Sequence, residues 1–172
     1  MRGIIEVYTG NGKGKSTAAF GLALRASGRG LKSLIIQFMK QGNSYGEHFA
    51  IEKIENIEIV SFGTPKFVNF KNPSKEDIDL ANEAYEFSKN AINSLKYDIV
   101  ILDEINIALH FNLINLEKVI DMLKNKPQNV EVVLTGRSAP KELIEIADLV
   151  SEIVEIKHPY QKGFAAREGI EY

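Results

Sequence analysis

The chain has 172 residues, which at roughly 100–200 residues per domain predicts a single domain with one core over residues 1–172. It contains no cysteine, which excludes disulfides, cysteine-based zinc sites, iron–sulfur clusters and a thiol nucleophile. Its net charge of −2 gives no overall basic field for nucleic acid, and its longest aliphatic run, residues 99–102, is too short to span a bilayer. We therefore expect a soluble cytoplasmic protein that binds neither nucleic acid nor membrane.

Short apolar runs alternate with helical patterns along the chain. A strand is expected over residues 4–8, a helix over 15–27 that ends at Gly28, and strands over 33–38 and 57–62. Ser74 is expected to cap a long helix, whose predicted apolar stripe is Leu80, Ala84, Phe87, Ala91 and Leu95. The rest alternates strand, helix, strand, helix and strand, over residues 97–102, 115–123, 130–134, 140–147 and 153–156.

This alternation predicts an α/β fold with a mainly parallel sheet and helices on both faces, because parallel strands need crossover connections. Ligands of such sheets bind at the carboxyl ends of the strands. The residues that carry chemistry are therefore expected directly after strands.

The strongest motif is Thr-Gly-Asn-Gly-Lys-Gly-Lys-Ser-Thr at residues 9–17, between a strand and a helix. This context is typical of a phosphate-binding loop, in which Lys15 reaches a phosphate and Ser16 offers its hydroxyl to Mg²⁺. The glycines that allow backbone N–H groups to turn inward are Gly10, Gly12 and Gly14. The usual pattern has glycine where this chain has Thr9. The alternative is a glycine-rich turn with an incidental Lys-Ser pair.

Two further strand ends carry charged residues. Asp103 and Glu104 follow a buried strand, which would place Asp103 beside Ser16 to hold Mg²⁺ directly or through water, with Glu104 polarising a water or supporting the metal shell. A solvated acidic turn is the alternative. Arg137 follows the strand over 130–134 and can pair with a phosphate, unless it is a capping or surface arginine.

Other residues leave two interpretations open. Gln37 and Lys40 follow the second strand and face either the nucleotide or solvent. Phe62, Phe67 and Phe70 form either core or a flat apolar platform for a ligand. The three histidines, His48, His110 and His158, are far apart in sequence and are expected to have packing or surface roles, and spacing alone assigns no role to Lys157 beside His158. Taken together, the phosphate loop and the charged strand ends predict a Mg-nucleotide-binding α/β domain but leave its reaction undefined.

The chain resembles the P-loop type of ATP:corrinoid adenosyltransferase, the cob(I)alamin or cob(I)yrinic acid a,c-diamide adenosyltransferases. The resemblance runs in order along nearly the whole chain. The segments that carry it are residues 9–21, 36–40, 46–47, 102–106, 133–137, 147–152, 157–160 and 163–172.

The resemblance implies a RecA-like fold and a reaction in which the cobalt(I) of a corrinoid attacks the 5′ carbon of ATP, so that triphosphate leaves. It implies that the triphosphate is held by Asn11, Gly12, Lys13, Gly14, Lys15, Ser16 and Thr17, in a loop that begins at Gly10. Asp103 and Glu104 would then serve Mg²⁺ or Mn²⁺, and Arg137 the phosphates. The resemblance also implies a homodimer and a flavoprotein or other reductase as the electron source.

Two departures from the family concern the corrinoid. Many members carry a basic N-terminal helix that covers the corrinoid, whereas this chain begins at the first predicted strand. Many also have Gly-Phe-Thr-Trp after the third strand, where this chain has Gly63-Thr64-Pro65-Lys66-Phe67. Phe62 or Phe67 would pack against the lower corrin face. The alternative functions are another P-loop kinase or ATPase and a non-catalytic nucleotide-dependent switch. A GTPase is not expected, because no Asn-Lys-x-Asp motif follows a strand.

Overall fold

The computed structural model describes residues 2–42 and 45–170, built around one six-stranded sheet. Every strand pair in it is parallel, and the strand order is β3-β2-β4-β5-β1-β6. The strands are β1 (Ile5–Thr9), β2 (Ser33–Phe38), β3 (Ile57–Phe62), β4 (Ile99–Asp103), β5 (Glu131–Thr135) and β6 (Leu149–Glu152). The first five lie within two residues of their predicted positions.

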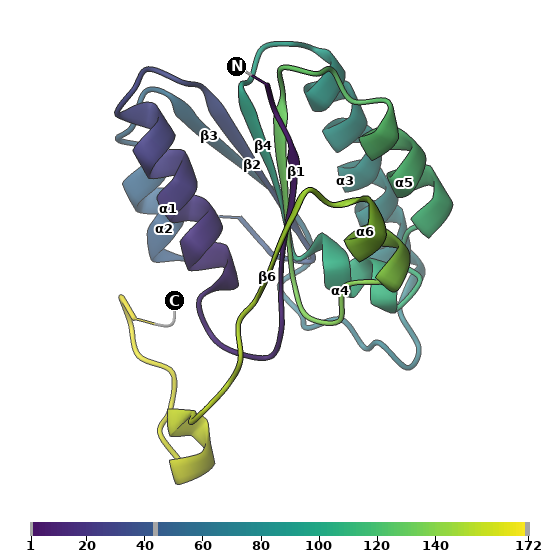
Figure 1. Cartoon of the computed structure of the whole chain (residues 1–172). Coiled ribbons are helices and arrows are strands. Elements are labelled where there is room, and N and C mark those ends of the chain that lie inside the picture. Colours follow the sequence, from purple (N-terminus) through teal and green to yellow (C-terminus); the bar gives the residue numbers. More distant parts are fainter. Residues whose placement is uncertain (1, 43–44, 171–172) are drawn as a thin grey trace.

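Helices cover both faces of the sheet, as Figure 1 shows, which confirms the predicted α/β architecture. One face carries α1 (Lys15–Ser27) and α2 (Gly46–Ile51). The other carries α3 (Lys75–Asn93), α4 (Ile105–His110), α5 (Leu116–Lys124) and α6 (Lys141–Ile146). A short 3₁₀ helix, η1 (Pro159–Lys162), follows β6. Across residues 2–42 and 45–170, every helix is too short or too polar to cross a membrane.

The central strands are buried on both faces, which explains their continuous apolar runs. Alternate residues serve different layers, because successive side chains of a strand point to opposite faces. Leu34, Ile36 and Leu102 belong to the apolar cluster under α3 and α5, whereas Ile35 and Ile101 belong to the cluster with Ala19 and Ala23 of α1. The sheet is thereby fixed between its helices, with all its carboxyl ends at one edge.

Helix α3 begins as predicted but buries a different face. Ser74 caps it, since its side chain accepts from the Asp77 backbone N–H while Asp77 accepts from the Ser74 N–H. Of the predicted stripe, Ala84 and Ala91 are buried and Leu80 is half-buried. Phe87 and Leu95 are exposed, which corrects the prediction. The buried face is Ala81, Ala84, Tyr85, Ser88, Ala91 and Ile92. The prediction included Phe87 and Leu95 because they are large and apolar, whereas the face that is buried consists mainly of small residues.

The last strand was predicted over residues 153–156, which is wrong: β6 lies four residues earlier. All four of its side chains are exposed, so it lacks the apolar signal of the other strands. It pairs with β1 up to Thr9 opposite Glu152. The Ile153 N–H still donates to the Thr9 carbonyl at 2.9 Å, but β1 ends at Thr9 and the chain turns into a loop, so among the described residues no strand lies beside residues 154–156.

Glu131 predicts a specific pH dependence of folding. Burial, together with a hydrogen bond to Glu6, raises its pKa to about 7. Between its ordinary pKa of 4.5 and about pH 7, the unfolded chain loses this proton while the folded chain keeps it, so this group lowers stability as the pH rises through that window. We expect Glu131→Gln to become more stable than the wild type across this window, with the difference constant above it. Urea unfolding from pH 4 to 9 measures this, with exposed Glu142→Gln as control; a pH-independent difference would contradict the assignment.

Candidate functional site

The loop between β1 and α1 is shaped by its glycines and by the chain that follows β6. Gly10 and Gly14 have φ angles of 98° and 120°, in the region that favours glycine. The Gly12 N–H donates to the Ile153 carbonyl at 2.7 Å. A Cβ on Gly10 would lie 2.4 Å from that same carbonyl oxygen. The segment after β6 therefore supports the loop from behind and makes glycine necessary at position 10.

Gly10→Ala is expected to destabilise the protein, because the new methyl group meets a backbone oxygen and the residue must keep a positive φ. The cost is at least about 1–3 kcal/mol from the backbone conformation alone. The matched control is Gly21→Ala, at an open position within α1, which should gain about 0.5–1 kcal/mol. Urea denaturation of the two variants measures both, and a Gly10→Ala protein as stable as the wild type would contradict this account of the loop.

Lys15 lies inside this loop. It is 8% exposed, and its ammonium donates to the Gly12 carbonyl at 2.7 Å. Burial lowers its pKa, the neighbouring Glu104 carboxylate opposes that shift, and Arg137 adds to it. At the start of α1, in the described loop and first turn, no side chain caps the helix and no acidic residue is present. The loop thus offers a cation and open backbone N–H groups to an anion.

Asp103, at the end of β4, is fully buried and held by several donors. The Thr135 hydroxyl donates to Oδ1 at 2.7 Å, and the Lys40 ammonium donates to Oδ2 at 2.8 Å. Burial by itself would raise the pKa of this carboxyl, but Lys40 and hydrogen bonds from Ser16 and Thr135 outweigh burial and hold the pKa below its usual value. Asp103 is therefore an ionised carboxylate hydrogen-bonded to Ser16, as its sequence position predicts.

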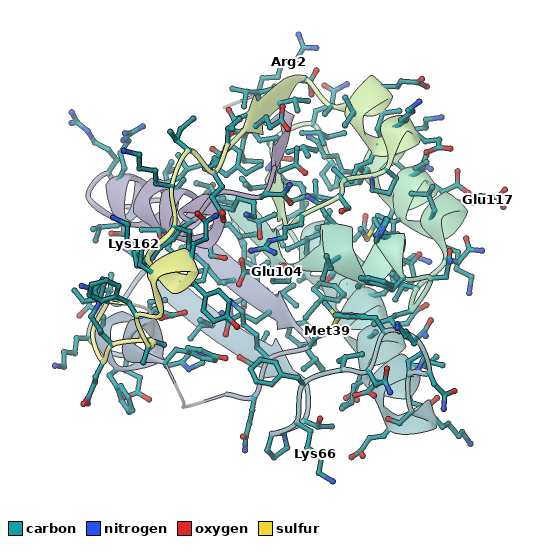
Figure 2. All side chains as sticks on the ribbon, turned by 90° about the horizontal axis from the view of Figure 1, so that it is seen from below. Arg2, Met39, Lys66, Glu104, Glu117 and Lys162 are labelled. Carbon is teal, nitrogen blue, oxygen red and sulfur yellow. The ribbon has the colours of Figure 1, made fainter. Side chains whose placement is uncertain are left out.

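Glu104 has the opposite electrostatic character. Its pKa is raised, first by burial and then by the neighbouring Asp103 carboxylate. Its backbone is left-handed, with φ 67°, and its N–H donates to the Thr135 hydroxyl at 3.0 Å. The bend carries the side chain from the end of β4 onto the pocket wall, and Figure 2 shows Glu104 near the middle of the molecule in the view from below. Two adjacent carboxyl groups thus differ in their affinity for a proton.

Gln37 lies behind Asp103 and is fully buried. Its amide donates to Asp103 Oδ2 at 3.2 Å, and its carbonyl oxygen meets His48 Nε2 at 2.7 Å and the Ser61 hydroxyl at 2.9 Å. Burial lowers the pKa of His48, which favours the neutral ring. His48 is buried and so has a packing role, one of the two roles expected for it. Its contact with Gln37 could not be predicted, because the six-residue α2 is too short to show helical periodicity.

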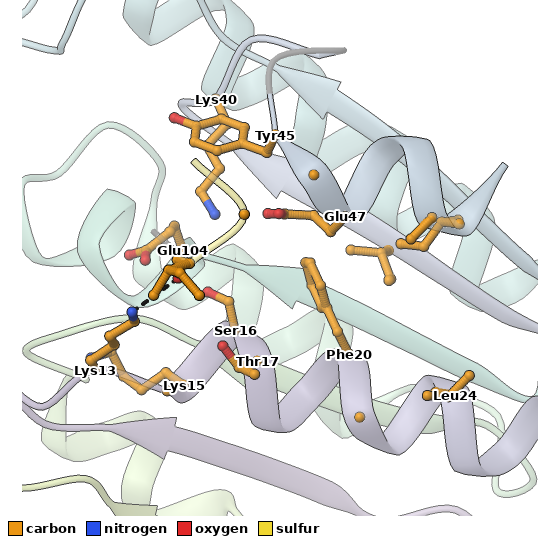
Figure 3. A pocket seen from close by; sticks show the side chains of 18 of the residues that line it. Lys13, Lys15, Ser16, Thr17, Phe20, Leu24, Lys40, Tyr45, Glu47 and Glu104 are labelled. Carbon is orange, nitrogen blue, oxygen red and sulfur yellow. Dashed lines mark hydrogen bonds between the residues drawn. The ribbon is translucent and has the colours of Figure 1, made fainter. Parts of the chain in front are cut away.

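The glycine loop, Lys15 and Glu104 line a pocket of about 700 Å³, large enough for a nucleotide. Figure 3 shows α1 and the loop on one side and Lys40, Tyr45 and Glu47 on the other. The predicted site residues on its wall are Gly12, Lys13, Gly14, Lys15, Ser16, Thr17, Glu104 and Arg137. Unpredicted wall residues include Phe20, Leu24, Ala50, Ile54, His158 and Ile170. The pocket therefore has a polar end at the loop and an apolar end between α1 and α2.

The remaining predicted residues lie off this wall. Gly10 and Asn11 precede the wall residues in the loop, whereas Gln37 and Asp103 support it from behind. Phe62 is half-buried in β3 with its ring 5.5 Å from that of Phe87, and Phe67 is fully exposed. The structure thus brings the phosphate-loop, acidic and arginine residues together and leaves the two phenylalanines apart from them.

The oxygen ligands at and beside Asp103 suit Mg²⁺, which in nucleotide sites binds one or two carboxylates together with phosphates and water. Ser16 and Asp103 supply a hydroxyl and an ionised carboxylate in direct contact, and Glu104 is adjacent. Among the described residues, no group of three or more His, Cys, Asp or Glu side chains forms a complete metal cage. The arrangement fits a metal that arrives with phosphate ligands better than one held by protein alone.

Comparisons with known proteins agree with this geometry. The family model described as ATP:corrinoid adenosyltransferase BtuR/CobO/CobP matches residues 1–172. A corrinoid adenosyltransferase from Sinorhizobium sp. is 41% identical over 174 residues, covering 99% of this chain and 81% of that protein.

Solved structures show the same fold. The flagellar accessory protein FlaH from Methanocaldococcus jannaschii has a TM-score of 0.61 at 11% identity, covering 88% of this chain and 71% of that one. A KaiC-like protein from Pyrococcus horikoshii has a TM-score of 0.57 at 19% identity, covering 91% and 75%. The fold is therefore RecA-like, as predicted.

Proposed function

Because the chain belongs to the ATP:corrinoid adenosyltransferase family, we propose that it moves the 5′-deoxyadenosyl group of ATP onto the cobalt(I) of a corrinoid and releases intact triphosphate. It is a transferase whose substrates are ATP and a corrinoid. The observation that carries the proposal is the position of Lys15, inside the glycine loop and next to the Asp103–Ser16 pair, in a pocket of nucleotide size.

Catalysis in this proposal rests on positioning and charge, because cobalt(I) is already a strong nucleophile and needs no side-chain base. The loop N–H groups and Lys15 hold the triphosphate, with Arg137 on the same wall, and their positive charges stabilise it as it leaves. The residues that would hold Mg²⁺ or Mn²⁺ are Ser16, Asp103 and Glu104. When bound, the metal supplies further neutralisation of the phosphate charge.

The corrinoid is assigned to the surface near Phe67, whose exposed ring offers an apolar face. Phe62 is the second candidate, although Phe87 covers part of it. Packing of either ring on the lower corrin face would disfavour an axial ligand and ease reduction of cobalt to cobalt(I).

The proposal includes a single domain over residues 1–172, a homodimer, a flavoprotein or other reductase as electron source, and a cytoplasmic location. Sedimentation equilibrium tests the dimer, and limited proteolysis tests the single domain. Cell fractionation tests the location. Candidate reductases are tested by replacing the chemical reductant with a reduced flavoprotein.

One spectrum tests the function. A free corrinoid is reduced with a strong reductant, and ATP and Mg²⁺ are added with and without the protein. We expect a protein-dependent change to the spectrum of a light-sensitive cobalt–carbon product. Release of ADP or AMP without this product would indicate a kinase or ATPase, and neither change would indicate a nucleotide-dependent switch.

A further inference from the structure

Lys40 is fixed in place by the backbone that follows β2. Met39 has a left-handed φ of 58°, and its N–H donates to the Phe62 carbonyl at 2.7 Å. Gly63 packs directly against this turn, since a Cβ on it would lie 2.4 Å from the Lys40 backbone nitrogen. From the sequence, Lys40 could face either a nucleotide or solvent. The fixed turn directs its side chain into the pocket.

The Lys40 ammonium lies at the acidic side of the pocket. It is 2.8 Å from Asp103 Oδ2 and 5.6 Å from the centre of the Tyr45 ring, and its side chain is 20% exposed. Figure 3 shows it entering from the side opposite α1 and pointing into the space between Glu47 and Glu104, above Ser16. An ammonium group has three N–H donors, so the bond to Asp103 leaves donors for a ligand.

We propose that Lys40 is a further triphosphate-binding cation, which contacts the phosphates of ATP from the wall opposite Lys15 while it remains paired with Asp103. A triphosphate in this pocket faces Glu47 and Glu104 on the wall near Lys40, and the negative charge of these carboxylates repels it. Lys15 and Arg137 offset this repulsion from the loop side, and Lys40 offsets it among the carboxylates themselves. The inference rests on the proposed function, because it requires a triphosphate ligand.

A purely structural role for Lys40 would be to neutralise the buried Asp103. The two roles separate when Asp103 no longer needs a counter-ion. In the Asp103→Asn protein, a lysine that served only to pair with Asp103 would contribute nothing to phosphate affinity. A lysine that contacts phosphate would still contribute to it.

The test is calorimetric titration of the full chain with inorganic tripolyphosphate in the absence of Mg²⁺. Lys40→Met is expected to weaken binding about tenfold or more, the range of a charge-assisted hydrogen bond. The same loss is expected between Asp103→Asn and Lys40→Met/Asp103→Asn. Lys40→Arg should retain most of the affinity, and exposed Lys53→Met is the control for net charge.

Equal affinity of Asp103→Asn and the double variant would overturn the proposal. If Lys40→Met does not fold, because Asp103 is left buried and unpaired, the comparison between Asp103→Asn and the double variant still decides the question. Wild-type protein that binds tripolyphosphate but forms no cobalt–carbon product would refute the proposed function and leave the role of Lys40 to be judged by these titrations.

Discussion

Lys15→Ala is expected to bind ATP at least about tenfold more weakly than the wild type, because a charge-assisted contact to phosphate contributes about 1.5–3 kcal/mol. Loss of adenosyl transfer should be at least as large, since the departing triphosphate carries more negative charge on its leaving oxygen than bound ATP does. The ammonium donates a hydrogen bond to the Gly12 carbonyl within its own loop, so its loss should leave the protein folded.

Calorimetric titration with ATP measures the loss, and the melting temperature checks the fold. Lys141→Ala, at an exposed position that begins α6, removes the same charge far from the pocket and should leave ATP affinity unchanged. Wild-type affinity in the Lys15→Ala protein would remove the phosphate-loop interpretation.

Asp103→Asn is expected to abolish most of the gain in ATP affinity and activity that Mg²⁺ provides. The amide keeps the shape of the carboxylate but is a poor ligand for a hard cation. ATP affinity without Mg²⁺ should barely change, because Asp103 lies behind the pocket wall rather than on it.

The measurement is ATP affinity and turnover as a function of Mg²⁺ concentration, with exposed Asp79→Asn as the control. Full Mg²⁺-dependent activity in the Asp103→Asn protein would show that this carboxylate is not among the metal ligands. A parallel Mn²⁺ titration is expected to show the same loss.

The parallel sheet and the polar end of the site follow from signals within single segments. Residues 9–17 contain a phosphate-loop motif that departs from the usual pattern only at Thr9. The runs before Asp103 and Arg137 are buried strands whose carboxyl ends meet at one edge. Because strand ends converge in such a sheet, short segments far apart in sequence define one pocket.

Other features depend on tertiary contacts that no local pattern encodes. β6 is exposed and exists because it pairs with β1, so its position could not be predicted from apolar periodicity. The orientation of Lys40 depends on the fit of Gly63 against the Met39 turn. The burial of His48 behind Gln37 depends on a six-residue helix. Each requires two distant segments to be placed together first.

The fate of the triphosphate tests the central claim most directly. Attack at the 5′ carbon leaves the bond between the β and γ phosphates intact, so γ-labelled ATP should yield labelled triphosphate in step with formation of the cobalt–carbon bond, with little free phosphate. ATP with a β,γ-methylene bridge should remain a substrate, because that bridge is not broken, whereas a kinase or ATPase would be blocked by it. Stoichiometric release of orthophosphate and ADP, without a light-sensitive cobalt–carbon product, would contradict the adenosyltransferase assignment.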